Sequence, residues 1–130
     1  MNCRVLLIGV SVAIFTACGV NAQEGDATAG ATVFNKCKAC HDAETDKNKI
    51  GPSLMNVIDR VAGTHPGFTY SKAMVEAGKA GLKWDEASLR EYLHNPKAKV
   101  KGTKMAFAGL KKEEDLSNLL AYLEQFSTKQ

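Results

Sequence analysis

Apolar residues recur at helical spacing in several segments of the chain and predict helices. The last helix has the strongest pattern: acidic residues 113–115 favour a helix N-terminus, and leucines then repeat every three or four positions. Asp85 is a suitable N-cap, and Asn95-Pro96 ends the helix that Asp85 begins. No alternating strand pattern and no internal repeat is present. The predicted helices cover residues 30–40, 71–77, 86–94 and a segment that starts at residue 113.

The N-terminus has the pattern of an export signal. A positively charged start precedes the uncharged, mostly apolar residues 5–17, and small residues before Ala22 suit cleavage by a signal peptidase. The apolar stretch is shorter than the ~20 residues of a membrane-spanning helix. We therefore expect a signal peptide over residues 1–22 and one periplasmic domain over residues 23–130. Alternatively, Cys18 lies in a segment that resembles a lipoprotein cleavage box, and its lipidation would tether the domain to a membrane.

Composition narrows the class of protein. The chain of 130 residues is 45% hydrophobic and 24% charged, which is typical of a soluble globular domain. Its formal net charge of +3 is too small to indicate a nucleic-acid partner without a basic stripe that contains aromatics. Only Cys37 and Cys40 lie beyond the expected signal peptide, too few for a disulfide scaffold or a zinc ribbon.

Cys37 and Cys40 begin a Cys-x-x-Cys-His sequence, the attachment pattern of a c-type haem. On one helical turn both thiols face the same side and can add to the two vinyl groups of a haem. His41 then directs its imidazole at the iron. Export agrees with this interpretation, because such a haem is attached outside the cytoplasm. The alternative is a thioredoxin-like dithiol, which requires a βαβ context that the pattern lacks.

Two long irregular stretches, residues 42–69 and 95–112, separate the predicted helices. Loops of this length normally count against an assignment in so small a domain. A covalent haem removes the objection, because it can form the centre of the core with a loop on each face. The loops and their borders are also too apolar for disorder. Their apolar residues include Ile50, Leu54, Val57, Ile58, Phe68, Tyr70 and Phe107.

A haem held by His41 needs a second axial ligand, and Met105 is the favoured residue. It lies in a non-helical stretch where a glycine lets the backbone approach closely. Met74 lies in a helical pattern, where a buried methionine usually packs in the core. A lone histidine in a loop or at a helix end is more often an exposed side chain than a ligand. The remaining candidate ligands are Met55, His65 and His94.

These features resemble the small class I cytochromes c, the group that includes mitochondrial cytochrome c and its short bacterial relatives. The resemblance covers nearly all of the chain beyond the signal peptide. It implies an all-α fold in which the N- and C-terminal helices cross, Gly30 lies against residues 119–122, and long loops wrap a haem-centred core. The blocks that carry it are CKACH (37–41), IGPSL (50–54), PGFTYS (66–71), KWD (83–85), EYLHNP (91–96) and GTKMAFAG (102–109).

The resemblance implies a role for each site residue. Cys37 and Cys40 would carry the thioether bonds, and His41 and Met105 would be the axial ligands. The carbonyl of Pro52 would accept a hydrogen bond from the second ring nitrogen of His41, which fixes its tautomer and its basicity.

The remaining matched residues would surround the haem. Tyr92 would donate a hydrogen bond to the axial sulfur, and Phe107 would shield the haem edge. Asp59 departs from the pattern, and we expect it to weaken one contact to a haem propionate. The expected donors to the buried propionates are Arg60, Tyr70 and Trp84.

Ligation by His41 and Met105 would leave no open position on the iron for oxygen or a substrate. A neutral thioether and burial both favour the ferrous state and raise the reduction potential. We therefore expect a periplasmic one-electron carrier with one haem c, not an enzyme. The alternatives are a haem enzyme or gas sensor with a displaceable Met105, and a lipid-tethered cytochrome subunit of a redox complex.

Positive charge is concentrated between residues 95 and 112, which contain six lysines and no carboxylate. We expect these lysines, with Lys36 and Lys38, to surround the haem edge of a monomer. They would steer transient docking with an acidic patch on a membrane cytochrome complex, oxidase, reductase or dehydrogenase. The alternative is that these lysines only form an ordinary solvated surface and have no role in docking. The six lysines are Lys97, Lys99, Lys101, Lys104, Lys111 and Lys112.

Overall fold

The structure is a computed structural model, and it describes residues 24–128 of the chain. The expected signal peptide, including Cys18, lies outside these residues. Within them the chain forms no strand, only an isolated bridge between Val61 and Lys83. None of the described helices is long and apolar enough to cross a membrane. The helices of this part are α1 (Ala27–Phe34), α2 (Lys72–Lys79), α3 (Glu86–His94), α4 (Pro96–Lys99) and α5 (Glu113–Glu124).

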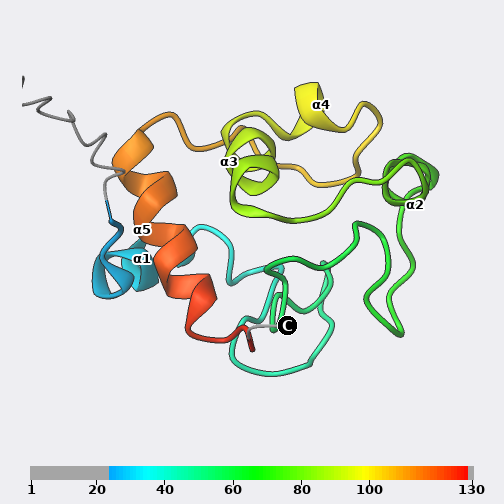
Figure 1. Ribbon diagram of the computed structural model, residues 1–130. Helices are drawn as coiled ribbons and strands as arrows, with labels where there is room; N and C mark the ends of the chain where they lie inside the picture. Colours follow the sequence, from blue (N-terminus) through cyan, green and yellow to red (C-terminus); the bar gives the residue numbers. More distant parts are fainter. Residues whose placement is uncertain (1–23, 129–130) are drawn as a thin grey trace, which may run out of the picture.

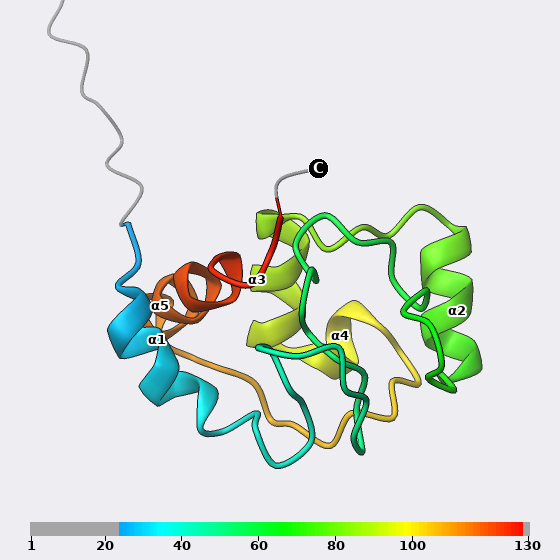
Figure 2. The same cartoon turned by 90° about the horizontal axis from the view of Figure 1, so that it is seen from below.

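Helices α1 and α5 pack together at one end of the molecule, and α2 lies at the other end (Figures 1 and 2). The Asp26 side chain caps α1 by accepting hydrogen bonds from two backbone N–H groups of the first turn. The helices approach closely at Gly30, where a Cβ would lie 1.9 Å from the carbonyl oxygen of Asn118 and 2.7 Å from the Cβ of Tyr122. Glycine is therefore required at this contact.

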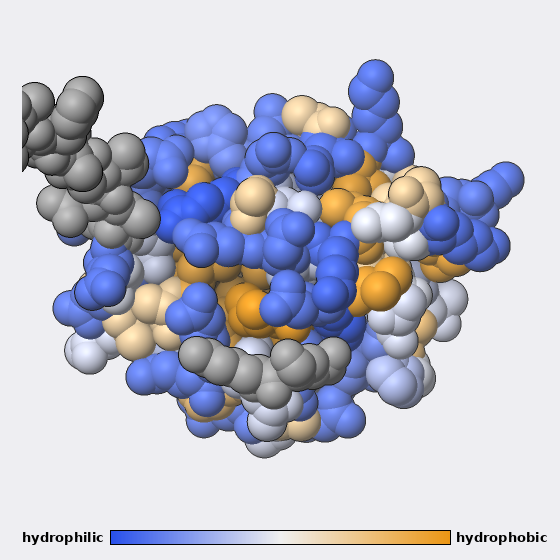
Figure 3. All heavy atoms as spheres, viewed as in Figure 1, coloured by the Kyte–Doolittle hydropathy of each residue, from blue (hydrophilic) through white to orange (hydrophobic). Residues whose placement is uncertain are grey.

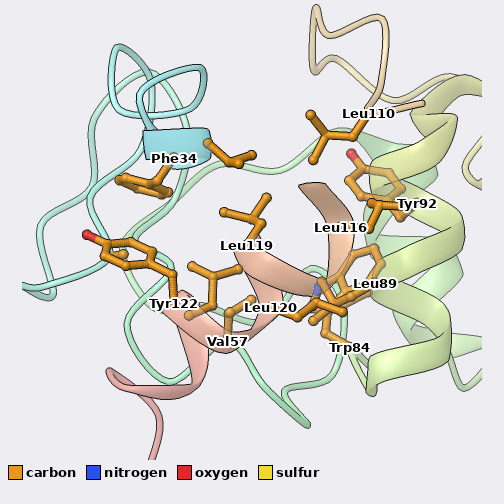
Figure 4. Packing of buried hydrophobic residues seen from close by; sticks show 14 of the residues in the cluster. Phe34, Val57, Trp84, Leu89, Tyr92, Leu110, Leu116, Leu119, Leu120 and Tyr122 are labelled. Atoms are coloured by element: carbon orange, nitrogen blue, oxygen red, sulfur yellow. The ribbon is translucent and has the colours of Figure 1, made fainter. Parts of the chain in front are cut away.

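The leucine stripe of α5 forms the centre of the hydrophobic core (Figure 4). On one side it meets the rings of Phe34 and Tyr122, whose centroids are 5.1 Å apart. On the other side it meets Trp84 and Tyr92, whose ring centroids are 4.8 Å apart. Burying each leucine contributes about 2 kcal/mol, so this stripe dominates the packing energy of the helical end. The buried leucines are Leu116, Leu119, Leu120 and Leu123.

Helix α3 has the predicted bounds and begins after its N-cap, Asp85, which accepts a hydrogen bond from the backbone N–H of Ser88. Helix α4 was missed and lies inside the expected loop. The Asn95 side chain accepts from the backbone N–H of Ala98, and Pro96 occupies the first turn. The Asn-Pro pair that ends α3 therefore also begins α4.

The predicted bounds of the other short helices were partly wrong. Helix α1 ends at Phe34, and residues 35–40 continue as consecutive turns. Helix α2 extends to Lys79, past Gly78, which was expected to stop it. A Cβ at Gly78 would lie 1.9 Å from the carbonyl oxygen of Ala62. This glycine therefore permits close packing rather than ending the helix.

The two long loops run between the α1–α5 pair and α2 (Figures 1 and 2). Backbone hydrogen bonds fix both loops to the helical part. The N–H of Leu110 donates to the carbonyl of Leu93 at 2.8 Å, and the N–H of Asn56 donates to that of Phe126 at 2.9 Å. These bonds hold the first loop beside the C-terminal end of α5 and the loop after α4 beside the C-terminal end of α3.

Candidate functional site

The Cys-x-x-Cys-His segment folds as one turn shortly after α1. The backbone N–H groups of Cys40 and His41 donate to the carbonyl of Cys37 at 3.0 and 2.9 Å. Both cysteines are half-buried free thiols. Burial raises the pKa of the Cys37 thiol to about 11, although the Lys36 ammonium acts in the opposite direction. Its sulfur is therefore uncharged at neutral pH, as a thioether sulfur also is.

The imidazole of His41 is held in a single tautomer. Its Nδ1 lies 2.8 Å from the carbonyl oxygen of Pro52, which can only accept, so the ring proton is on Nδ1. Burial lowers the pKa of His41, although the bond to Pro52 acts in the opposite direction. A Cβ at Gly51 would lie 2.3 Å from the ring, so glycine is needed there. The result is a neutral imidazole whose Nε2 lone pair is available to a metal.

Met105 lies half-buried in the loop between α4 and α5. The Tyr92 hydroxyl is 4.0 Å from its sulfur and 2.8 Å from the hydroxyl of Thr103. The Thr103 oxygen also accepts from the Met105 backbone N–H at 3.4 Å. All three bonds are satisfied together if Thr103 donates to Tyr92 and Tyr92 donates to the sulfur. Sequence reasoning missed Thr103, although a hydroxyl two residues before the methionine was a visible signal.

The three residues expected to bind propionates lie together. The backbone N–H of Trp84 donates to the carbonyl of Arg60 at 2.8 Å. The Arg60 guanidinium lies 3.1 Å from the Nδ1 of His65, and the Tyr70 hydroxyl accepts from the His65 backbone N–H at 3.2 Å. Arg60 also donates to the carbonyls of Ser53 and Met55 at 3.0 and 3.3 Å.

His65 differs from its sequence-based expectation. It is 8% exposed rather than an ordinary surface side chain, whereas His94 is exposed as expected. The ring is covered because it lies between the side chains of Arg60 and Asp46, which come from other parts of the loop. A turn has no apolar periodicity, so no local pattern in the sequence could have indicated this burial.

The groups at these positions match the chemistry of a haem with two thioether bonds. The site offers two thiols, a neutral imidazole with a free Nε2, a thioether, and a guanidinium and a phenol that can donate to carboxylates. Half-buried apolar side chains from both loops pack against the hydrophobic core. They include Leu54, Ile58, Tyr70, Met105 and Phe107. The described residues therefore fit haem c.

Comparison with known proteins identifies the family. The family profile described as cytochrome c matches residues 27–127. The chain belongs to the cytochrome c family. It is 53% identical over 108 residues to cytochrome c2 of Afifella marina, covering 82% of this chain and 87% of that protein. It is 50% identical over 103 residues to cytochrome c-550 of Nitrobacter winogradskyi, covering 78% of this chain and 92% of that protein.

A solved structure of cytochrome c2 from Rhodospirillum centenum has a TM-score of 0.75 and 44% identity, covering 80% of this chain and 100% of that one. The expected all-α cytochrome c fold is confirmed. The chain is a class I bacterial cytochrome c with one covalently attached haem c, and Cys37 and Cys40 have the spacing that this attachment needs. Its general role is electron transport.

Proposed function

We propose that this cytochrome c is a periplasmic one-electron carrier with His41 and Met105 as axial ligands and thioethers at Cys37 and Cys40. The observation that carries the proposal is the hydrogen bond from His41 to the Pro52 carbonyl, which leaves Nε2 as the free donor atom. Bound haem c supplies the iron that accepts and releases one electron. Because His41 and Met105 would both be bound to the iron, no position would be left for a substrate, and transfer of electrons is the proposed activity.

Each side chain of the site has a defined task in this proposal. Pro52 keeps the proton on the Nδ1 of His41 and so maintains the basicity of its Nε2. Tyr92 and Thr103 orient the sulfur of Met105, and the neutral, half-buried thioether favours the ferrous state. The propionates would receive hydrogen bonds from Arg60, Tyr70 and Trp84.

Absorption spectra of the holoprotein, exported by a host with haem-attachment machinery, test the ligand assignment. We expect a covalently bound low-spin haem with the weak far-red band of methionine–ferric ligation. Met105→Ala should lose that band and let the ferrous protein bind carbon monoxide rapidly. Met74→Leu is the matched control, since it conserves volume at a buried methionine in α2 and should keep the band.

Two results would contradict the assignment. A far-red band that survives in Met105→Ala would move the axial ligand to another residue. Rapid carbon monoxide binding by the native ferrous protein would favour a haem enzyme or gas sensor.

We propose that docking of this monomeric carrier depends on the lysines that the fold leaves exposed. Three of the eight expected lysines are already bonded: Lys36 to Asp115 at 3.7 Å, Lys99 to Glu91, and Lys111 to a backbone carbonyl at 2.7 Å. On the face shown in Figure 3, apolar areas lie among hydrophilic side chains. Of the eight, the side chains that form neither an ion pair nor a hydrogen bond within residues 24–128 are those of Lys38, Lys97, Lys101, Lys104 and Lys112.

Small redox complexes of opposite charge can measure the electrostatic effect of these lysines without a known partner protein. At low salt, Lys101→Gln/Lys104→Gln should slow reduction by ferrocyanide about threefold and should not slow reduction by hexaammineruthenium(II). Lys79→Gln is the control, because Lys79 is exposed on α2 and pairs with Glu76. Equal ferrocyanide rates for the double variant and the control would contradict steering by these lysines.

We further propose that export removes residues 1–22, so that the secreted chain begins at Gln23. The intact mass of the protein released from the periplasm by osmotic shock tests this directly. A chain that begins at an acylated Cys18 and stays with the membrane would instead identify a lipid-tethered cytochrome subunit.

A further inference from the structure

His65 is a buried imidazole that lies outside the proposed pair of axial ligands. Its Nδ1 lies 3.1 Å from a guanidinium nitrogen of Arg60, and its Nε2 lies 3.2 Å from a carboxylate oxygen of Asp46. Its backbone N–H donates to the Tyr70 hydroxyl at 3.2 Å. One residue therefore contacts two of the three groups proposed to bind the haem propionates.

The contacts define the protonation state of this ring. A guanidinium only donates, so Nδ1 accepts from Arg60 and the single ring proton lies on Nε2, which donates to Asp46. A second proton, on Nδ1, would face the N–H of Arg60 and break that hydrogen bond. Burial and the charge of Arg60 lower the pKa of His65, and Asp46 raises it.

The groups that face His65 are Arg60 and Asp46, which are charged, and Tyr70, which is titratable. Burial raises the pKa of Tyr70, although Arg60 acts in the opposite direction, so its phenol is neutral near physiological pH. His65 is therefore the member of this cluster that can change charge between the acidic and the neutral range.

We propose that His65 is a positioning residue that couples the uptake of a proton to reduction of the protein through Arg60 and Tyr70. The proposal rests on the proposed function, because it places the propionates at these two residues. When a redox partner donates one electron, the added negative charge favours the protonated imidazole. A proton from water then binds Nδ1, the Arg60–His65 bond breaks, and Arg60 keeps its bonds to the carbonyls of Ser53 and Met55. Oxidation returns the electron to a partner and the proton to water.

The direction of the pH dependence follows from this coupling. The pKa of His65 is higher in the reduced protein than in the oxidised protein, so acid favours reduction. The reduction potential is therefore highest at acidic pH, falls as the pH rises between the two values, and is level above them. Because burial lowers the pKa of this imidazole, the fall lies on the acidic side of the ordinary value of 6.5.

Two measurements on the holoprotein test the proposal: the reduction potential against pH, and NMR titration of His65 in both oxidation states. We expect the acid dissociation constant of His65 to be about threefold larger in the ferric protein. His65→Gln should abolish the fall in potential, because glutamine can accept from Arg60 and donate to Asp46 but does not titrate. His94→Gln, at the exposed histidine, should leave the fall unchanged.

Equal dissociation constants in the two oxidation states would overturn the proposal, as would a fall in potential that persists in His65→Gln. If His65→Gln does not fold, the NMR titration of the native protein still shows whether the pKa of His65 depends on the oxidation state. Failure of the coupling would leave the far-red methionine band in place. Failure of the proposed function would remove that band or permit rapid carbon monoxide binding, so the two failures are distinguishable.

Discussion

The α1–α5 pair and the first long loop are stabilised by different means. The pair buries an apolar stripe, with Leu116 and Leu119 each 1% exposed. The loop depends on polar side chains that bond to its own backbone. The buried Ser53 hydroxyl donates to the Thr45 carbonyl at 2.6 Å, and the Asn48 side chain bonds to Ser53 and Pro66. Apolar packing therefore stabilises the helical end, and we expect the loop, with its half-buried apolar residues, to depend on the haem.

The largest effect should follow from removing the haem attachment. Cys37→Ser/Cys40→Ser removes both thioether bonds, and we expect it to lower the free energy of unfolding by about 5 kcal/mol or more, most of the stability of a small domain. Far-UV circular dichroism should show loss of most helix, because both loops lose the group on which they fold. Cys40→Ser alone should be intermediate. A double variant that unfolds as cooperatively as the holoprotein would show that the loops do not depend on the haem.

The second prediction concerns a substitution that affects the helical end alone. In Gly30→Ala the new methyl group would lie 1.9 Å from the backbone oxygen of Asn118, so α1 must move away from α5. Overpacking of this kind destabilises by about 3 kcal/mol, measurable by guanidinium unfolding of the holoprotein. Ala31→Ser is the control at the next, exposed position of α1. A loss below about 1 kcal/mol in Gly30→Ala would mean that the helices separate easily.

The same contrast explains what the sequence could predict. Helices α3 and α5 were predicted well because their signals are local: the Asp85 cap begins α3, and an acidic first turn and a leucine periodicity mark α5. The bonds of Asn48 to Ser53 and Pro66 join residues 5 and 18 positions apart and leave no periodic pattern. The contacts that bury His65 leave no periodic pattern either.

The candidate site was predictable only in part. Cys37, Cys40 and His41 could be proposed from their spacing, because attachment of a haem requires these three residues on one helical turn. The residues that support the ligands, Pro52 and Tyr92, were assigned only through the resemblance, since they are distant in sequence from the atoms they orient.

The hydroxyls of Tyr92 and Tyr122 allow the loop that carries Met105 to be compared with the α1–α5 pair by one kind of substitution. Tyr92→Phe removes the bonds to Thr103 and Met105, and we expect a loss of about 1 kcal/mol in stability and easier displacement of the methionine by added imidazole. Tyr122→Phe removes a 3.3 Å bond to Glu44 and should not alter displacement by imidazole. Equal imidazole affinities in both variants would exclude a role for Tyr92 in holding the sulfur.

The smallest effect concerns backbone strain within the loop. Among the described residues, Asp59 and Asn56 are the non-glycine positions with positive φ, 62° and 57°. Left-handed backbone costs an L-residue roughly 1 kcal/mol, and less for Asn and Asp. Substitution with glycine removes this strain, but the greater freedom of glycine in the unfolded chain offsets part of the gain in stability. Asp59 is exposed, and its backbone N–H bond to the Trp84 carbonyl at 3.0 Å survives in glycine. Asp59→Gly should therefore raise the free energy of unfolding of the holoprotein by about 0.5 kcal/mol.

Asn56→Gly is the matched control, because it relieves the same backbone conformation and also removes a side chain that forms bonds. The Asn56 amide oxygen accepts from the backbone N–H and the hydroxyl of Thr128 at 2.9 and 3.1 Å, which ties the loop to the end of α5. We expect this variant to lose about 1 kcal/mol, measured as a lower guanidinium midpoint at an unchanged slope. If both variants gained stability, strain rather than the bond to the α5 end would dominate at Asn56. If both lost stability, the side chain of Asp59 would contribute to the loop despite its exposure, and the polar bonding that distinguishes this region would extend to its surface.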